Sequence, residues 1–325
     1  MNFVKLALEN GGTIKPLIIP TEYTNGTGLC NPSVFVDEGK ILINLRHIQY
    51  TLYHSELQKY EHQYGPLVYL NPENDISLTT TNFICELNEN LDVCYYTKVD
   101  TSSFDKTPLW EFVGLEDARL IKWNDKYYLT GVRRDLDTIG TGRMELSELE
   151  FSETSVREVS RFRVPGPPPD DEYCNKNWMP ILDMPFHYVK WTNGTQIVRT
   201  IPEENRTETK VQKDWVWAPK DLRGGSQVLP YKDGYLAINH ETDLFQSEAG
   251  RKNATYRHKF TFWDKDWNIQ KFSPVFSFLE HQIEFACGMA KYQDDYLITF
   301  GVQDNAAYIL RVPGKFMEDF INEQT

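Results

Sequence analysis

The 325-residue sequence predicts an all-β fold, because short apolar strands recur along it and helical periodicity is scarce. Runs of β-branched and aromatic residues alternate with turns that contain Asp, Asn or Gly. Aromatic residues make up 14% of the chain, as 18 Phe, 18 Tyr and 8 Trp, and such side chains favour strands. The one convincing amphipathic helix covers residues 313–323, where Phe316, Phe320 and Ile321 share a side.

A turn-and-strand unit recurs five times. Each copy has a turn, then Tyr or an aliphatic residue, then an apolar strand that ends in polar groups. The copies begin near residues 37, 124, 185, 232 and 293, the copy at 185 being weaker. Repeats of this size are typical of propeller blades, which bury their faces against their neighbours. We therefore expect a five-bladed β-propeller with a short C-terminal helix, formed by residues 1–325 as a single domain.

Polar residues close these repeated units, where we expect the strands that line a central channel to end. Any one of them could simply bind loop backbone, but their recurrence at one point of the repeat favours a site. They are Arg46, Arg133, Arg134, His240, Glu241 and Asp304.

Charge and composition exclude several function classes. Lys and Arg number 34 and Asp and Glu 47, a net charge of −13, which argues against a nucleic-acid partner bound through a basic surface. No apolar run approaches the roughly 18–20 residues that span a bilayer, so no membrane partner is expected. Glu9 interrupts the N-terminal apolar stretch, which predicts no signal peptide and a cytoplasmic protein. Homo-oligomerisation stays open.

Cysteine usage gives no sign of a metal site. The five cysteines form no CxxC pair, and we expect buried, reduced thiols. No His, Asp or Glu cluster has metal-ligand spacing, so we expect neither a metal nor a resident cofactor.

The most informative segment is Gly114-Leu-Glu-Asp-Ala-Arg-Leu120, in which two carboxylates and an arginine precede a strand. Strand alternation would send Glu116 to one side, and Asp117 and Arg119 to the other. An Asp held beside a cation at a channel mouth can bind a sugar hydroxyl or act as an acid. A turn with a surface ion pair is the equally weighted alternative from these residues alone.

This segment resembles the Gly-x-Glu-Asp-Pro/Ala-Arg signature of glycoside hydrolase family 130, which comprises five-bladed propeller mannoside phosphorylases and related β-mannosyltransferases. Four further matches follow the family's order, from residue 31 to about 307. They are Asn31-Pro-Ser33 with Arg46, Lys176-Asn-Trp-Met-Pro180, the Gly-rich loop and strand of 224–240, and Phe300-Gly-Val-Gln-Asp304.

The sequence also departs from the family pattern. Ala118 replaces the usual Pro, Asp221-Leu-Arg223 stands for Lys-Ile-Gly, Met179-Pro180 breaks the Leu-Phe-Pro register, and Asn239-His240 replaces Tyr-His. These changes affect the residues that would bind the nucleophile and not those that would bind the sugar.

The resemblance implies roles for individual residues. Asp117 would be the general acid, acting directly or through a sugar hydroxyl. Asn31, Arg46 and Asp304, with Glu116 beside them, would hold the glycosyl residue. A cationic cluster would receive inorganic phosphate or the phosphate of a sugar-phosphate or nucleotide-sugar co-substrate. Its candidates are Arg143, Lys176, Arg223 and His240. A phosphate nucleophile is already an anion, so it needs cations and no catalytic base.

Aromatic residues near the expected loops have two interpretations. Their rings could stack on an acceptor sugar, or they could pack between blades, which is the more frequent role. They are Tyr50, Tyr53, Trp178, Trp215, Trp217 and Tyr231. Trp178 is the preferred sugar platform because it adjoins Lys176.

Three functions compete. The first is inverting transfer of a glycosyl group, mannosyl by resemblance, as a glycoside phosphorylase or glycosyltransferase acting on a carbohydrate. The second is a non-catalytic carbohydrate-binding propeller, which would show no turnover. The third is an inverting hydrolase, which needs a second carboxylate about 6.5–9.5 Å from Asp117, with Glu241 as the candidate.

Overall fold

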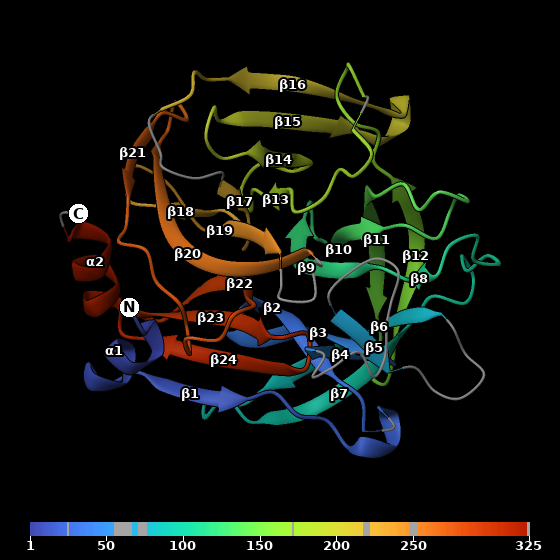
Figure 1. Ribbon diagram of the computed structural model, residues 1–325, viewed down its shortest axis with the longest axis horizontal. Helices are drawn as coiled ribbons and strands as arrows, with labels where there is room; N and C mark the ends of the chain where they lie inside the picture. Colours follow the sequence, from blue (N-terminus) through green and yellow to red (C-terminus); the bar gives the residue numbers. More distant parts are fainter. Residues whose placement is uncertain are drawn as a thin grey trace.

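Five blades of mainly antiparallel strands surround a common centre in the computed structural model (Figure 1), and a short parallel pairing of their outermost strands joins the first two blades into one sheet. The structure describes residues 1–24, 26–54, 67–70, 77–170, 172–216, 222–246 and 252–323. The prediction of an all-β, five-bladed propeller is confirmed. The innermost strands of the five blades lie together in the middle of the view, and the outermost strands lie at the rim.

The blades follow the chain in order and are numbered 1 to 5 here. Blade 1 comprises, from the inside outward, β2 (Leu29–Asp37), β3 (Lys40–Ile48), β6 (Leu78–Leu87) and β7 (Val93–Asp100). Blade 2 comprises β9 (Glu116–Trp123), β10 (Lys126–Arg133), β11 (Arg143–Phe151) and β12 (Val156–Arg163). Blade 3 comprises β13 (Met179–Pro180), β14 (His187–Trp191), β15 (Gln196–Ile201) and β16 (Arg206–Gln212).

The last two blades are less regular. In blade 4 two short inner strands, β17 (Leu222–Gly224) and β18 (Leu229–Tyr231), both pair with β19 (Gly234–Gln246), followed by β20 (Lys252–Asp264) and β21 (Ile269–Phe272). Blade 5 comprises β22 (Glu284–Tyr292), β23 (Asp295–Val302), β24 (Ala306–Val312) and the N-terminal β1 (Thr13–Pro16). Outside the blades, β4 (Thr51–His54) pairs with β5 (Leu67–Leu70), and β8 (Phe112–Val113) runs parallel to the start of β6.

The repeated sequence unit corresponds to the second strand of every blade, that is β3, β10, β14, β19 and β23. The channel itself is lined by the first strands, and β2 contacts both β9 and β22. The expectation that the repeated strand would be the innermost one is therefore wrong by one strand. The polar ends of the second strands still matter, because Arg46 reaches the first strand of the next blade.

The N-terminus closes the ring. Strand β1 adds to the edge of β24, so the two ends of the chain share blade 5. The predicted C-terminal helix is α2 (Gly314–Asn322), with Phe320 and Ile321 buried. A second helix, α1 (Phe3–Glu9), packs against it, with the Phe3 and Phe320 rings 4.9 Å apart.

Helix α1 was not expected from the sequence, because seven residues are too few for a clear periodic pattern. Its start does carry a local signal: the Asn2 side chain accepts a hydrogen bond from the Lys5 backbone amide at 2.9 Å, as an N-cap residue does.

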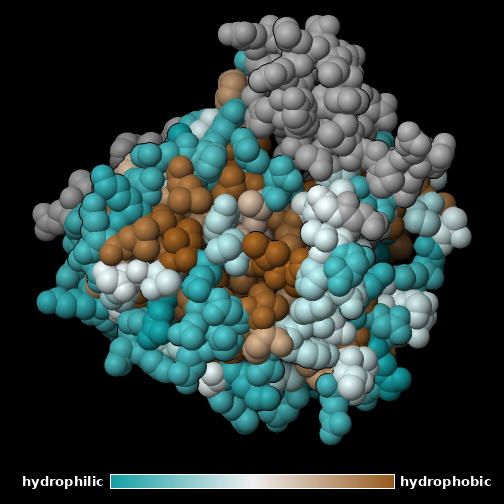
Figure 2. Space-filling view, turned by 90° about the horizontal axis from the view of Figure 1, so that it is seen from below, coloured by the Kyte–Doolittle hydropathy of each residue, from teal (hydrophilic) through white to brown (hydrophobic). Residues whose placement is uncertain are grey.

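Most large aromatic residues lie in the packing between blades and around the helices. Trp123, Trp178, Trp263 and Phe260 are each at most 1% exposed. On the side of the molecule shown in Figure 2, hydrophobic residues gather in the middle between hydrophilic margins. Neither helix of the described chain has the length and apolar character needed to cross a membrane.

Candidate active site

A hydrogen-bonded cluster joins blades 1, 2 and 5 at the centre of the propeller. The Asn31 side-chain amide donates to Asp117 Oδ1 at 2.8 Å and to Asp304 Oδ1 at 3.0 Å. Arg46 Nη1 donates to the same Asp117 oxygen at 2.7 Å. The residue that the family resemblance assigned as general acid, Asp117, is therefore linked by hydrogen bonds to three that it assigned to the sugar, although these residues are up to 273 positions apart.

Arg46 is the central cation of this cluster, and its side chain is only 3% exposed. Besides Asp117, it contacts Glu116 Oε2 at 3.4 Å, the Tyr50 hydroxyl at 3.2 Å and Thr80 Oγ1 at 3.1 and 3.2 Å. A buried guanidinium with this many partners has one orientation, so it fixes the position of the Asp117 carboxylate.

A β-bulge brings both carboxylates of the signature segment to Arg46. The register between β9 and β10 shifts between the pairs Thr130–Arg119 and Val132–Glu116. The expected alternation, which placed Glu116 and Asp117 on opposite sides, is therefore wrong at this point. Gly131 faces the bulge, and a Cβ there would overlap the Glu116 carbonyl oxygen. No signal in the residues themselves revealed this extra residue.

Backbone conformation also marks the cluster. Asn31, Asp117 and Asp304 have φ values of 43°, 48° and 48°, in the left-handed region that non-glycine residues seldom occupy. Asn and Asp tolerate this region best, and such conformations concentrate at functional sites. The three side chains that meet at the centre thus all depend on an unusual backbone geometry.

Arg119 stabilises the cluster through hydrogen bonds to backbone carbonyl groups. Its Nη1 donates to the Asp117 carbonyl oxygen at 2.6 Å, while Nε and Nη2 donate to the Gly225 carbonyl oxygen at 3.0 and 2.6 Å. The guanidinium also lies 5.5 Å from the centre of the Phe285 ring. Arg119 therefore ties blade 2 to blades 4 and 5.

The three carboxyl groups differ in their pKa values. Burial raises the pKa of Asp117, but the guanidiniums of Arg46 and Arg119 and the Asn31 hydrogen bond outweigh it, so this pKa lies below its usual value. Burial raises the pKa of Glu116 and of Asp304 above their usual values, and the neighbouring Asp117 charge adds to this effect. Asp117 is thus the most readily ionised carboxyl group of the three.

Basic residues, which form the cationic side of the site, lie within electrostatic range of this acidic cluster. Lys176 is exposed and forms no ion pair with any residue in the described part of the chain. Its charge lowers the pKa values of Asp117, Asp304 and His240, so it lies within electrostatic range of all three. Arg223 lies directly opposite His240 on the neighbouring strand and also lowers the His240 pKa.

His240 is buried, and its ring contacts Tyr256 and Phe285 at centroid distances of 5.0 and 5.2 Å. Burial, followed by the charges of the neighbouring basic groups, holds its pKa well below the usual value, so the imidazole is neutral. Tyr256 was missed by sequence reasoning. It lies in a β20 segment without a recognisable motif, yet Lys176, Asp304, Arg223 and Asp117 all influence its pKa, which burial raises.

Arg143 lies apart from this cationic side. Its guanidinium pairs with Asp170 at 3.3 Å and donates to the Glu172 carbonyl oxygen at 2.8 Å. Its described contacts therefore do not join it to Lys176 or His240.

The aromatic candidates divide between core and surface. Trp178 is 1% exposed, packs edge-on to Tyr188 and belongs to a hydrophobic cluster of blades 2 and 3. The expectation that its ring is a sugar platform is not supported, because no face of the ring is open. Tyr50 and Tyr231 are also buried, whereas Trp215 is 59% exposed. The Trp217 residue and the Tyr53 side chain lie outside the described residues.

Glu241 is engaged elsewhere. It is 4% exposed, and Lys259 Nζ lies 2.7 Å from its Oε1. His240 and Glu241 are consecutive in β19, so their side chains point to opposite faces of the sheet. Within the described ranges, no group of three or more His, Cys, Asp or Glu side chains could hold a metal ion.

Solved structures of other proteins share this architecture. No family model and no curated protein matches the sequence. The β-1,2-mannobiose phosphorylase of Listeria innocua superimposes with a TM-score of 0.57 at 15% identity, covering 95% of this chain and 96% of that one. The mannose phosphorylase MPT-4 of Leishmania mexicana, in complex with phosphate, gives 0.54 at 12% identity, covering 97% and 93%.

The chain has the fold of the GH130 mannoside phosphorylases. A further solved structure, reported for GH130 glycoside hydrolases that target β-1,2-mannosidic linkages in Candida mannan, gives a TM-score of 0.57 at 12% identity, covering 89% of this chain and 85% of that one. In this GH130-like fold, the cluster around Asp117 lies where the first strands of blades 1 and 2 begin.

Proposed function

We propose that the protein is a carbohydrate-active enzyme that transfers a glycosyl group, mannosyl in the first instance, with inversion. The observation that carries the proposal is the Asp117 carboxylate, held by Arg46 and sharing the Asn31 amide with Asp304. The GH130-like fold supports the carbohydrate class. Two neighbours are bound to β-1,2-mannobiose and to phosphate, respectively, which supports a mannosyl group and a phosphate.

The sugar would be held by the acidic side of the cluster. Within the described structure, Asp117 and Asp304 each use only Oδ1 for side-chain hydrogen bonds. The second oxygen of each carboxylate is therefore able to accept a bond from a sugar hydroxyl. Because both carboxylates bind the same Asn31 amide, their second oxygens can accept hydrogen bonds from neighbouring hydroxyl groups of one ligand.

Asp117 would transfer the proton. Its lowered pKa leaves it ionised in the free protein, and this form can take a proton from the acceptor hydroxyl, directly or through a sugar hydroxyl. In phosphorolysis the same group would return that proton to the glycosidic oxygen. The ionised state makes synthesis the first direction to assay.

The phosphate would lie on the cationic side. Lys176 is exposed and without an ion pair in the described chain, and its charge acts on the neutral His240, which lies opposite Arg223 on the neighbouring strand. We assign these three residues to inorganic phosphate, a sugar phosphate or a nucleotide sugar, and we assign no metal or resident cofactor. The contacts of Arg143 favour a supporting position for it outside this group.

The two alternatives have less support. A hydrolase would need a second carboxylate to activate water, and Glu241 is occupied by Lys259. A binding-only propeller would not need a carboxylate with a lowered pKa beside two with raised pKa values, because such separation is typical of proton transfer.

The direct test is an assay of donors and acceptors. We would incubate the protein with mannose 1-phosphate, or with a nucleotide-activated mannose, and with mannose or mannobiose as acceptors. We expect a longer oligosaccharide and release of phosphate or nucleotide in equal amounts. Turnover with water as the only acceptor would show that the protein is a hydrolase and not a transferase. If no donor is turned over, the protein only binds carbohydrate.

A further inference from the structure

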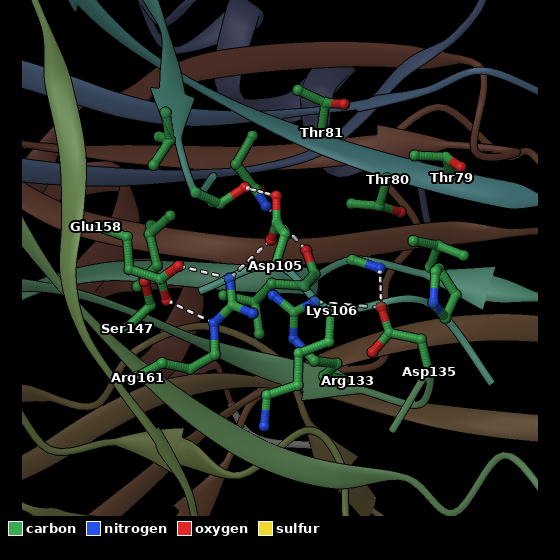
Figure 3. Close-up of a pocket in the computed structure, with 18 of the residues that line it drawn as sticks. Thr79, Thr80, Thr81, Asp105, Lys106, Arg133, Asp135, Ser147, Glu158 and Arg161 are labelled. Carbon is green, nitrogen blue, oxygen red and sulfur yellow. Dashed lines mark hydrogen bonds and ion pairs between the residues drawn. The ribbon is translucent and has the colours of Figure 1, made fainter. Parts of the chain in front are cut away.

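A second cavity lies between blades 1 and 2, outside the cluster at the centre. Its volume is about 310 Å³, and its walls come from β6 and β7 on one side and from β10, β11 and β12 on the other (Figure 3). The segment from Thr101 to Leu115, together with Asp135 and Leu136, contributes the remaining wall. Every residue that lines the cavity belongs to the described chain.

This cavity combines charged side chains with apolar ones such as Leu115 and Leu129, which belong to the hydrophobic cluster between the same two blades. Elsewhere that space is filled by aliphatic side chains such as Leu42, Ile84, Leu120 and Leu149. In the cavity, Arg161 and Arg133 lie next to each other, between Glu158 and Asp135 (Figure 3). Blades stack through apolar faces, so a charged gap between them requires another explanation.

The two arginines are neutralised by carboxylates. Arg161 Nη2 contacts Glu158 at 2.6 Å and Asp105 at 3.0 Å, and Arg133 contacts Glu145 at 2.7 Å and Asp135 at 3.2 Å. These four pairs fix the walls. They do not use all the hydrogen-bonding capacity of the cavity.

Groups of both signs remain available to a ligand. Asp135 is 5% exposed, and its Oδ1, drawn without a dashed line in Figure 3, is buried without a hydrogen-bond partner among the described residues. Lys98 and Lys106 also line the cavity, are exposed and form no ion pair with any residue of the described ranges. The available acceptor is thus buried, and the two available cations are exposed.

We propose that this cavity binds a small anionic polyol, of which a hexose phosphate is the simplest representative. The phosphate would contact Lys98 and Lys106, and a sugar hydroxyl would donate to Asp135 Oδ1. The hydroxyls of Thr81 and Ser147 line the same space. The site is separate from the catalytic cluster, with which it shares Thr80, a hydrogen-bond partner of Arg46.

Isothermal titration with mannose 6-phosphate tests this site. We would use the Lys176→Ala protein, which lacks the cation assigned to phosphate at the centre, so that binding reports on the cavity. In this background, Lys98→Ala with Lys106→Ala should weaken binding about tenfold or more, since two charge-assisted contacts are lost. The matched control, Lys5→Ala with Lys315→Ala, removes the same charge from the two helices and should leave binding within about twofold.

Two further measurements complete the test. Ser147→Leu fills the cavity from its wall and should abolish binding, with a melting curve to show that the protein is folded. Inorganic phosphate alone should bind at least about tenfold more weakly than the hexose phosphate, because it cannot reach Asp135. The proposal is overturned if Lys176→Ala binds no hexose phosphate, if the Lys98 and Lys106 changes or Ser147→Leu leave binding intact, or if phosphate alone binds equally well. Absence of any glycosyl transfer would not alter these titrations.

Discussion

At the scale of single residues, the site depends on how buried charges are arranged around Arg46. The guanidinium touches two carboxylates, and Asn31 links one of them to a third. Three carboxyl groups close together repel one another when ionised, and one buried cation cannot compensate all of them. The result is one acidic group, Asp117, beside two whose pKa values are raised.

Asn substitutions at Asp304 and Asp117 should therefore change stability in opposite directions at pH 7. Asp304 has a pKa above its unfolded value of 3.8, so its charge destabilises the folded state at neutral pH. We expect Asp304→Asn to raise the free energy of unfolding by about 1 kcal/mol, and the gain should vanish as the pH falls through the folded pKa toward the unfolded one.

Asp117 behaves in the opposite way, because its folded pKa lies below 3.8. Its stabilising contribution is present above the unfolded pKa and is lost as the pH falls through the folded one. Asp117→Asn should lower the free energy of unfolding at pH 7 by about 1 kcal/mol. Urea titrations at several pH values measure both variants, and equal signs at pH 7 would contradict this electrostatic account.

Removal of Arg46 should be far more damaging. Arg46→Met leaves Glu116 and Asp117 buried without their cation and should lower the free energy of unfolding by about 3–5 kcal/mol. Combining it with Glu116→Gln and Asp117→Asn should restore part of this loss, since fewer charges then remain unpaired. If the triple variant is no more stable than Arg46→Met alone, the loss comes from packing rather than from charge.

Sequence motifs predicted the residues of this cluster, but they did not predict which aromatic residues lie around it. Asn31, Arg46, Asp117 and Asp304 were found through short motifs, and the structure brings them together. Trp178 was chosen because it is near Lys176 in sequence, but neighbouring residues in an extended segment point in different directions. Tyr256 belongs to no motif. It reaches the electrostatic surroundings of Asp117 and Asp304 only because the strand β20 folds back from a distant part of the chain.

At the scale of elements, the β-bulge in β9 determines the site. Period-two alternation predicted Glu116 and Asp117 on opposite faces, and one extra residue in the strand cancels that rule. The repeat was detectable in the sequence because the second strand of a blade is buried on both faces. Its apolar run is therefore the clearest signal in each blade. The first strands gave no such run, because polar or small residues interrupt β2, β9 and β22, and the first strands of blades 3 and 4 have only two or three residues.

Gly131→Ala tests the role of the bulge. The added Cβ overlaps the Glu116 carbonyl oxygen, so the bulge must shift and move both carboxylates away from Arg46. We expect a loss of about 1–3 kcal/mol in the free energy of unfolding and at least about tenfold in glycosyl transfer. Gly39→Ala is the control: it has open space around it but a φ of 85°, and it should cost about 1 kcal/mol without affecting transfer. Equal transfer rates in the two variants would show that the bulge does not position the site.

At the scale of the whole molecule, the ring is held closed by the N-terminus. Strand β1 completes blade 5, and helix α1 inserts Phe3 among Phe260, Phe276 and Phe320. The sequence predicted the number of blades, but not this closure, because four residues of β1 and seven of α1 give no periodic signal. Long-range pairing of the two chain ends is a tertiary property that local patterns do not record.

Phe3→Ala should therefore destabilise the entire propeller. Phe3 is fully buried, and truncation should lower the free energy of unfolding by about 3–5 kcal/mol. Leu8→Ala is the control in the same helix, because Leu8 is 44% exposed and should change stability by no more than about 0.5 kcal/mol. Similar losses in both variants would mean that α1 contributes through its helical backbone rather than through the Phe3 packing.

The central claim is that Asp117 moves the proton during glycosyl transfer, and leaving-group dependence measures this most directly. The parent and Asp117→Asn are compared on a mannobiose, whose leaving group needs a proton, and on a dinitrophenyl mannoside, whose leaving group does not. With phosphate as nucleophile, we predict that Asp117→Asn loses about 10²–10⁴-fold in kcat/KM on mannobiose. On the activated mannoside it should stay within about tenfold of the parent. An equal loss on both substrates would contradict the assignment, because it would mean that Asp117 binds the sugar without transferring a proton.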